Sequence, residues 1–262
     1  MKRWLCLAVV LMLDGCASGP RIDTTYTSRS QDSRAQFLII HYTAGGFLGS
    51  LKWLTEGPVS SHYLVNDNPP TIYGLVDENR RAYHAGVSYW KGNTQLNASS
   101  IGIEIVNLGS KHTPDGQQWI DYPQEQIEAV VALIKKIVKE HGIRPERVLA
   151  HSDIAPQRKT DPGPKFPWKQ LADAGLVQWP DADLVALRRP AFDIQVPDVT
   201  WFQGNLAQHG FTVPLNGELD EETRKVIAAF QMKYRPANFD GIPDAETAAL
   251  LDVLNSPNGN LK

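Results

Sequence analysis

Two histidines stand at the ends of short apolar runs, where a buried strand would give way to a loop. His41 closes the run 37–40 and His151 closes the run 148–150. In open α/β sheets, ligands gather beyond the carboxyl ends of strands. Asp161 follows in a proline-rich stretch. Two histidines and one carboxylate, with a fourth position left for water, are a recurrent set of catalytic zinc ligands.

Each of these residues also has an ordinary interpretation. A single histidine at a strand end is more often a surface or capping residue, and Asp161 before Pro162 could simply begin a turn. Glu104 adds weight to the catalytic interpretation, because it lies in the run 101–106 among Ile, Val and Gly. A buried carboxylate is costly unless it is paired or protonated, and a raised pKa suits a general acid–base residue. On an edge strand, Glu104 would instead face solvent.

Lys159 precedes Asp161 by two positions. In an extended segment such residues point the same way, so Lys159 could stabilise an oxyanion at the same centre, although a loop lysine is usually a solvated charge. His62 and His84 could line a substrate groove or serve as hydrogen-bonded structural groups, and Asn107, which follows the run with Glu104, could hydrogen-bond a peptide ligand. Several tryptophans could stack on sugar rings, although packing is their more common role: Trp53, Trp90, Trp119, Trp168 and Trp179.

The elements that must position these residues alternate between strands and a helix. Helical spacing of apolar residues predicts a helix over 124–141, with Gly142 as its C-terminal cap. Apolar runs predict five strands, at 35–41, 60–65, 71–76, 101–106 and 147–151. This order is typical of an α/β layer structure.

The N-terminus has the pattern of a secretory signal. Two basic residues precede the apolar run 4–13, which is too short for a bilayer span of about 20 residues. Leu13-Asp14-Gly15-Cys16 resembles a bacterial lipobox, although Asp14 departs from the usual small or apolar residue. Lipidation of Cys16 would anchor the protein in the outer membrane at its periplasmic face, because Ala17 is not the inner-membrane retention signal. The alternative is a plain secretory signal with an incidental cysteine.

The C-terminal part contains two matching blocks, 217–223 and 241–247, which both read Gly-x-x-Asp-x-Glu-Thr and precede an apolar helical pattern. Asp220 and Asp244 are suited to cap these helices. The patterning breaks at 188–190. We therefore expect a signal peptide at 1–15, a lipidated tether at 16–34, a metal-binding domain at 35–185 and an all-α domain at 190–262.

Composition excludes some classes of protein. The chain has 262 residues, of which 42% are hydrophobic and 21% charged, as in ordinary globular proteins. Its net charge of −3 lacks the basic excess of a nucleic-acid-binding protein, so no nucleic-acid partner is expected.

The segments around these residues resemble the N-acetylmuramoyl-L-alanine amidase type 2 family, the zinc amidases of the peptidoglycan-recognition type. The matching segments are 38–43, 60–65, 83–86, 100–104 and, as the longest, 148–163. The resemblance implies a mixed central β-sheet flanked by helices. It assigns one Zn²⁺ to His41, His151 and Asp161, the proton acceptor to Glu104 and transition-state stabilisation to Lys159. The tail is similar to the three-helix peptidoglycan-binding domain.

The activity implied is hydrolysis of the amide between the lactyl group of muramic acid and L-alanine, on peptidoglycan and muropeptides, by a monomer. Two rival functions stay open. Relatives without a full ligand set bind peptidoglycan without cutting it, and a zinc peptidase would cut within the stem peptide. The complete set of candidate ligands disfavours the first, and the absence of a His-Glu-x-x-His motif disfavours the second.

Overall fold

The computed structural model describes residues 19–114, 116–257 and 259, in two units that divide after Asp32. Residues 19–32 are exposed and form no helix or strand. The expected signal peptide and the lipidation site Cys16 lie outside the described residues. No helix in the described part of the chain is long and apolar enough to cross a membrane.

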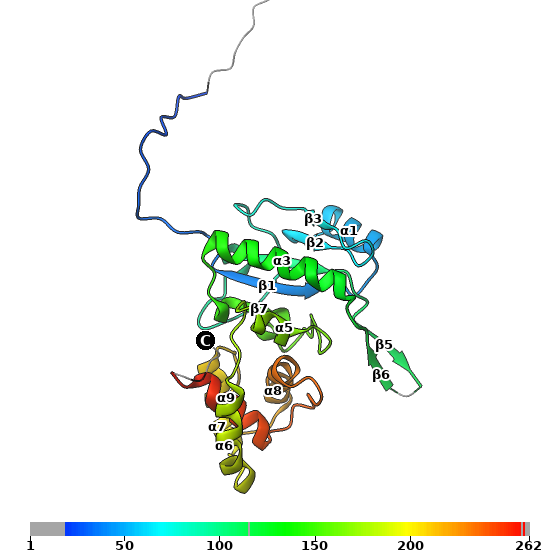
Figure 1. The fold of residues 1–262 in the computed structure, drawn as a ribbon, viewed down its shortest axis with the longest axis vertical. Helices are drawn as coiled ribbons and strands as arrows, with labels where there is room; N and C mark the ends of the chain where they lie inside the picture. Colours follow the sequence, from blue (N-terminus) through cyan, green and yellow to red (C-terminus); the bar gives the residue numbers. More distant parts are fainter. Residues whose placement is uncertain (1–18, 115, 258, 260–262) are drawn as a thin grey trace, which may run out of the picture. The chain divides into compact units, whose positions relative to one another are not determined.

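The second unit is built on a five-stranded mixed sheet with the strand order β3-β2-β4-β1-β7 (Figure 1). β4 pairs in parallel with both β1 and β2, β1 also pairs in parallel with β7, and only β3 is antiparallel to its neighbour. The expected mixed α/β sheet is therefore confirmed. The strands are β1 Phe37–Tyr42, β2 Tyr63–Val65, β3 Ile72–Gly74, β4 Ser100–Ile105 and β7 Val148–Ala150.

One face of the sheet is covered by α3 (Gln124–His141), whose bounds are those expected from the sequence. Gly142 ends this helix with a φ of 65°, a left-handed conformation that glycine adopts without a steric penalty. Alternate residues of β1 and β4 pack against the helix in a common core that includes Leu38, Ile40, Ile101, Ile103, Val130 and Ile134. Burial of these side chains provides the hydrophobic stabilisation of this layer.

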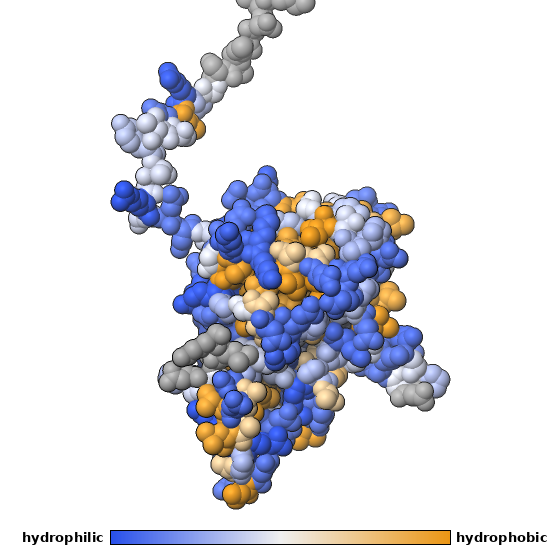
Figure 2. Space-filling model, viewed as in Figure 1, coloured by the Kyte–Doolittle hydropathy of each residue, from blue (hydrophilic) through white to orange (hydrophobic). Residues whose placement is uncertain are grey.

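The opposite face of the sheet is covered by the C-terminal helices (Figure 1). Phe37, Ile39 and Leu149 of the sheet share one buried cluster with residues of α7 (Val199–His209), α8 (Glu221–Tyr234) and α9 (Ala245–Asn255). The members from these helices include Phe202, Leu206, Val226, Phe230 and Leu251. The C-terminal region thus supplies one layer of the sheet's own core. In the view of Figure 2, hydrophobic surface lies over part of these helices.

The two matching sequence blocks form the same structure twice. Asp220 accepts a hydrogen bond from the Thr223 amide, and Asp244 accepts one from the Thr247 amide, so the expected helix caps are confirmed. A buried glutamine also serves each block in the same way: Gln203 bonds the Thr223 hydroxyl and the Gly217 amide, and Gln231 bonds the Thr247 hydroxyl and the Gly241 amide.

Three details differ from the expectations. β7 ends at Ala150, and His151 begins the short helix α4 (His151–Ile154) instead of ending the strand. The helix α6 (Ala182–Ile194) runs through Pro190, across the interval where the patterning breaks. It begins at the Asp181 cap and is held to α9 by the ion pair between Arg188 and Asp252. A polar hairpin, β5 (Ser110–Thr113) with β6 (Gly116–Trp119), was not expected, since it lacks an apolar alternation.

The remaining elements are short. α1 (Phe47–Glu56) follows β1 and packs its Leu54 against Leu64 and Val106. The others are α2 (Leu96–Ser99), the 3₁₀ turn η1 (Pro145–Arg147) and α5 (Trp168–Asp173).

Candidate metal centre and active site

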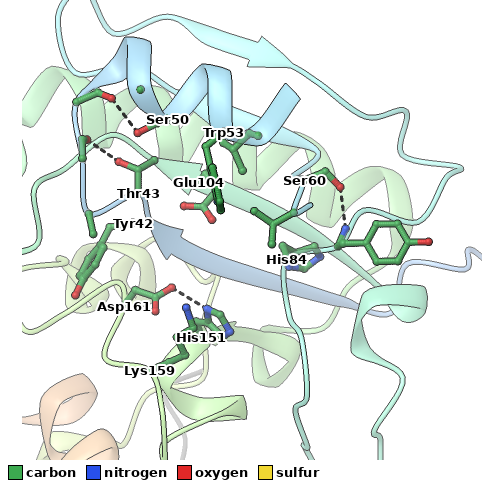
Figure 3. A pocket seen from close by; sticks show the side chains of 17 residues that line it. Tyr42, Thr43, Ser50, Trp53, Ser60, His84, Glu104, His151, Lys159 and Asp161 are labelled. Carbon is green, nitrogen blue, oxygen red and sulfur yellow. Dashed lines mark hydrogen bonds and ion pairs between the residues drawn. The ribbon is translucent and has the colours of Figure 1, made fainter. Parts of the chain in front are cut away.

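Strand register places His41 beside Glu104. The two residues are direct partners in the parallel ladder between β1 and β4, so their side chains leave the same face of the sheet. β4 lies between β1 and β2, which rules out the alternative that Glu104 sits on an edge strand. Glu104 lines a cavity together with His151, Lys159 and Asp161 (Figure 3).

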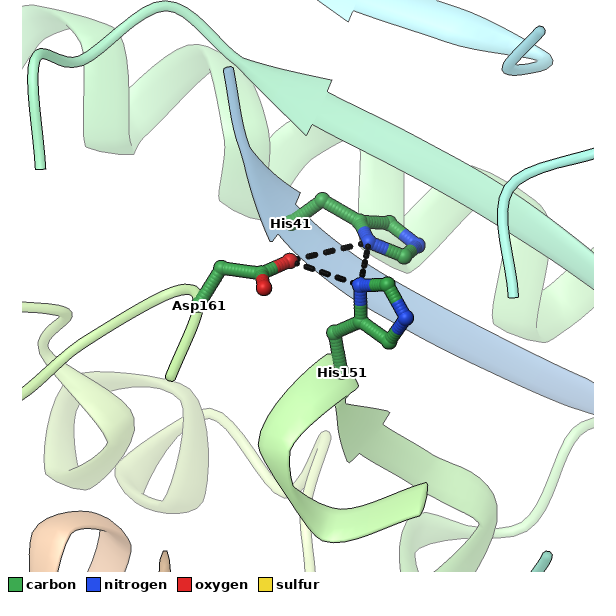
Figure 4. Close-up of side chains that lie close together, drawn as sticks. All are labelled: His41, His151 and Asp161. Atoms are coloured by element: carbon green, nitrogen blue, oxygen red, sulfur yellow. Dashed lines mark hydrogen bonds and ion pairs between the residues drawn. The ribbon is translucent and has the colours of Figure 1, made fainter. Parts of the chain in front are cut away.

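Three donor atoms converge at this cavity. His41 Nδ1 lies 2.9 Å from His151 Nδ1 and 3.0 Å from Asp161 Oδ2, and the last two atoms are 2.9 Å apart. All three side chains are buried and point toward one another (Figure 4). They come from the end of β1, the start of α4 and the loop that follows α4. The structure thus brings together three residues that are up to 120 positions apart in the chain.

Local hydrogen bonds fix the two ligands that lie close in sequence. The Asp153 carboxylate accepts a hydrogen bond from the Ala150 amide at 2.8 Å, which closes the turn from β7 into α4 and sets the direction of His151. The Ser152 amide donates to the Asp161 carbonyl at 3.0 Å. Asp161 is therefore tied by its backbone to the residue after His151.

The outer nitrogens of both histidines have hydrogen-bond partners. His41 Nε2 lies 3.0 Å from His84 Nδ1, and His84 Nε2 lies 3.2 Å from the Ser100 hydroxyl, which donates to the Leu96 carbonyl. His151 Nε2 lies 3.3 Å from the Ala85 carbonyl. Such partners orient an imidazole and select the tautomer that leaves Nδ1 free for a metal. His84 thus lines the cavity and also supports His41.

Gly102 makes room for the His84 ring. A Cβ added at Gly102 would lie 2.5 Å from His84 Cγ, a distance that side chains essentially never show. The ring therefore packs directly against the backbone of β4 at Gly102. Glu104, two residues later in the strand, faces the same side of the sheet.

Burial and neighbouring charges set the protonation states. Burial and the nearby His151 lower the pKa of His41 to about 4, which keeps its imidazole neutral at pH 7. Burial alone would raise the pKa of Asp161, but the adjacent imidazoles of His151 and His41 hold it below its usual range. Burial, together with repulsion from Asp161, raises the pKa of Glu104 well above its ordinary value, and Lys159 opposes this in part.

These residues fit a metal ion. Tetrahedral zinc with bonds of about 2.0–2.1 Å would have donor atoms about 3.3 Å apart, close to the distances seen here. Imidazole nitrogens and a carboxylate oxygen are suitable donors for it. Glu104 Oε2 is buried and has no hydrogen-bond partner among the described residues, which leaves it free for a water or substrate atom. The buried His-His-Asp group is therefore compatible with a metal.

The cavity has a volume of about 400 Å³ and extends from His151 and Asp161 along the loop between β1 and α1. Several residues that line it were not predicted as site residues. They are Tyr42, Thr43, Ser50 and Ser60, which Figure 3 labels, and Tyr83. Tyr42 and Thr43 directly follow His41, so their position in the sequence was a usable signal. Trp53 also lines the cavity with a side chain that is 59% exposed, whereas Trp90 and Trp168 are buried core residues.

His62 and Asn107, two predicted substrate-binding residues, are not among the residues that line this cavity. His62 is fully buried; its Nδ1 accepts a hydrogen bond from the Gly102 amide, and its Nε2 contacts the Arg80 carbonyl. The Asn107 amide group donates to the carbonyls of Ile120 and Asp121, and its Oδ1 accepts from the Gly109 amide. For His62, this arrangement favours the structural role that the sequence left open. The Asn107 side chain is likewise bound to backbone groups of the fold.

Comparison with known proteins identifies the family. Residues 31–164 match the family model of N-acetylmuramoyl-L-alanine amidases, and residues 195–251 match that of a peptidoglycan binding domain. The amidase AmiD of Escherichia coli is 42% identical over 97% of this chain and 98% of its own length. The 1,6-anhydro-N-acetylmuramyl-L-alanine amidase AmpD of Enterobacter cloacae is 40% identical over 38% of this chain and 49% of its own.

Solved structures agree with these matches. The complex of E. coli AmiD with the substrate anhydro-N-acetylmuramic acid-L-Ala-D-γ-Glu-L-Lys has a TM-score of 0.83 and covers 90% of this chain and 94% of that one. AmpDh3 of Pseudomonas aeruginosa is 38% identical, with a TM-score of 0.83 over 90% of this chain and 98% of that one. The chain therefore belongs to the N-acetylmuramoyl-L-alanine amidase family, with a C-terminal peptidoglycan-binding-type region, and is an amide hydrolase that acts on muropeptides and peptidoglycan.

Proposed function

We propose that this amidase is a zinc enzyme, with His41, His151 and Asp161 as the ligands of one Zn²⁺, Glu104 as the general base and acid, and Lys159 as the oxyanion stabiliser. The observation that carries this proposal is the convergence of the three ligand atoms within 3.0 Å of one another, beside the Glu104 carboxylate in one cavity. A zinc ion held there would polarise the scissile carbonyl and lower the pKa of a bound water to about 7.

Glu104 performs both proton transfers in this mechanism. Its raised pKa makes it a stronger base than an ordinary carboxylate, so it accepts a proton from the attacking water. Protonated Glu104 then returns that proton to the amine of L-alanine, which leaves poorly as an anion. The buried and unpartnered Oε2 supports this role, because no other group in the described part of the chain competes for its proton.

Lys159 lines the same cavity and is only partly buried. Its ammonium would interact with the negative charge that develops on the lactyl carbonyl oxygen in the transition state. No described carboxylate forms an ion pair with Lys159, so its charge is available to the substrate.

The substrates are muropeptides that carry the lactyl–L-alanine amide. Two similar proteins have been solved with ligands of this kind, namely AmiD with an anhydro-muramyl tripeptide and AmpDh3 with an anhydromuramic pentapeptide. We infer that this chain also takes 1,6-anhydro-muropeptides. His84 and the exposed Trp53 line the cavity and are candidates to contact the muramyl part.

The cellular setting is part of the same proposal. Lipidation of Cys16 would tether a monomeric enzyme through residues 16–34 to the outer membrane, facing the periplasm. The basis is the lipobox-like sequence before Cys16. The amidase domain would occupy 35–185 and the helical domain 190–262, where the match to a peptidoglycan binding domain supports a contact with the wall.

Digestion of isolated sacculi by the purified protein tests the proposed reaction. Mass spectrometry should find released stem peptides that begin with L-alanine, and a chelator should abolish the release. Shorter peptides, cut within the stem, would instead identify a peptidase. Retention on sacculi without any release would identify a binding protein.

A further inference from the structure

The C-terminal helices contact the segment that carries two of the proposed metal ligands. This segment, residues 151–163, contains His151 near its start and Asp161 near its end. Ile154 and Ala155 of the segment belong to the same buried cluster as Phe230 and Tyr234 of α8. The layer that covers this face of the sheet therefore also supports the metal-binding loop.

A buried ion pair forms the most specific of these contacts. Lys233 of α8 donates to Asp153 Oδ2 at 2.6 Å, and the two side chains are 5% and 1% exposed. The Lys233 ammonium also lies 4.4 Å from the centre of the Trp168 ring, a favourable cation–π distance. When either partner of such a buried ion pair is removed, the other charge stays buried without a partner, which strongly destabilises the fold.

Asp153 connects this ion pair to the metal group. The oxygen that pairs with Lys233 also accepts the hydrogen bond of the Ala150 amide, across the turn that begins at His151. Lys233 thus fixes the carboxylate that closes this turn. A displacement of Asp153 toward solvent would open the turn. It would therefore also displace the imidazole of His151, which lies two residues before Asp153.

Two further contacts hold the rest of the segment from the same side. The Gln157 side-chain amide donates to the Glu222 carbonyl at the start of α8, at 3.0 Å. Trp119 packs between the Phe239 ring, 6.0 Å away between centroids, and Gly163, where an added Cβ would lie 3.1 Å from the indole. Phe239 belongs to the loop between α8 and α9, so the loop that carries Asp161 is also supported by the C-terminal region.

We propose that Lys233 is a positioning residue for the metal centre, and that the C-terminal helical region completes the amidase site in addition to any role in wall binding. This inference rests on the proposed zinc site. Lys233 acts through Asp153 on His151, and it contacts neither the metal nor the substrate. The expected consequence of its loss is weaker metal binding by a protein that is still folded.

Zinc affinity of the full-length Lys233→Met variant tests this inference. Competition with a chromophoric chelator should show zinc binding about 10- to 100-fold weaker than in the unchanged protein, the usual effect of removing a partner that orients a ligand. Lys225→Met is the matched control. It makes the same change on the same helix at an exposed pair with Glu221, and its zinc affinity should stay within about twofold, because surface ion pairs contribute little.

Circular dichroism and thermal unfolding of the metal-free proteins establish that each variant is folded at the temperature of the titration. If folded Lys233→Met binds zinc as tightly as the unchanged protein, Lys233 has no positioning role and the inference is wrong. If the unchanged protein binds no zinc, the proposed function itself fails, which is a separate result.

A second variant covers the case in which Lys233→Met does not fold. Lys233→Met combined with Asp153→Asn leaves no buried charge unpaired, and the asparagine oxygen can still accept the Ala150 hydrogen bond. This variant lacks the link to α8, so its zinc affinity should also fall, by about 10-fold, the lower end of the effect of losing an orienting partner. Unchanged affinity in this folded double variant would overturn the inference.

Discussion

His41 and Glu104 are direct partners across the parallel strands β1 and β4, so one position of strand register places a proposed metal ligand beside the proposed general base. Their side chains project from the same face of the sheet. A slip of one residue in this pairing would direct one of the two side chains toward α3 instead. The central pair of strands thus determines the basic geometry of the active site.

Replacement of the proposed base tests the division of labour between proton transfer and metal binding. Glu104→Gln keeps the size of the side chain but removes its ability to accept a proton. We expect kcat to fall by about 10²–10⁴, the usual contribution of general acid–base catalysis. Elemental analysis should still find one zinc per chain. Loss of zinc from this variant would show that Glu104 is a ligand and not a base.

Replacement of Lys159 tests the stabilisation of the oxyanion. Lys159→Met should lower kcat/KM by about 10²–10³, as removal of a single oxyanion donor does in other enzymes. Zinc content should not change, because Lys159 contributes none of the three converging atoms. Lys169→Met, at an exposed pair with Asp173, provides the control. Equal activities of the two variants on a defined muropeptide would contradict the role of Lys159.

The close packing of His84 on Gly102 predicts a sensitivity to one added methyl group. Gly102→Ala would force the imidazole away from β4 and disturb its contact with His41. We expect zinc binding to weaken by about 10- to 100-fold. Gly204→Ala in α7, where nothing lies within 4 Å of the new Cβ, should instead leave zinc binding unchanged and stabilise the fold by about 0.5–1 kcal/mol. Chelator competition and urea unfolding distinguish these outcomes.

Buried His209 predicts that acid destabilises the C-terminal layer. Burial among aromatic rings, with repulsion from Lys233, lowers the pKa of His209 to about 3. The pKa of His209 is lower in the folded protein than in the unfolded chain. Between these two pKa values, the unfolded chain therefore binds more protons than the folded protein. This residue therefore contributes stability that is complete above about pH 6.5 and is lost as the pH falls toward 3, at about 1 kcal/mol between pH 6.5 and 5.5.

His209→Phe removes this titration and should flatten the pH dependence of the free energy of unfolding by that amount. Urea unfolding at pH 7.5, 6.5 and 5.5 measures the difference between the variant and the unchanged protein. His112→Gln, at an exposed position of the β5–β6 hairpin, should leave the pH dependence as it is. A constant difference between His209→Phe and the unchanged protein at all three values would show that His209 does not titrate in this way.

The parts of the fold with strong local patterning could be predicted from the sequence. The helix at 124–141 has an apolar residue at nearly every core-facing position, and its bounds were predicted correctly. The matching blocks near Asp220 and Asp244 carry their own caps. By contrast, β5 and β6 are polar strands held by backbone pairing, and α6 continues through Pro190, with Arg188 paired to Asp252 of α9. Neither feature has a local signature of hydrophobic periodicity.

The site shows a similar division. Four of the five residues assigned to the metal centre and its chemistry, Glu104, His151, Lys159 and Asp161, line one cavity in the structure. The fifth, His41, contacts His151 and Asp161. The sequence could not show that His62 is a structural residue and not a site residue, because its hydrogen bonds to Gly102 and Arg80 depend on contacts across the fold. Lys233 could not be predicted at all, since its partner Asp153 is 80 residues away and a helical lysine is usually exposed.

Anomalous diffraction from crystals grown with zinc locates the metal itself. We expect one zinc ion per chain, bound by His41 Nδ1, His151 Nδ1 and Asp161 Oδ2 at about 2.0–2.2 Å, with a fourth position that faces Glu104. A zinc ion bound elsewhere, or no anomalous peak between these three side chains, would show that the proposed metal centre is wrong.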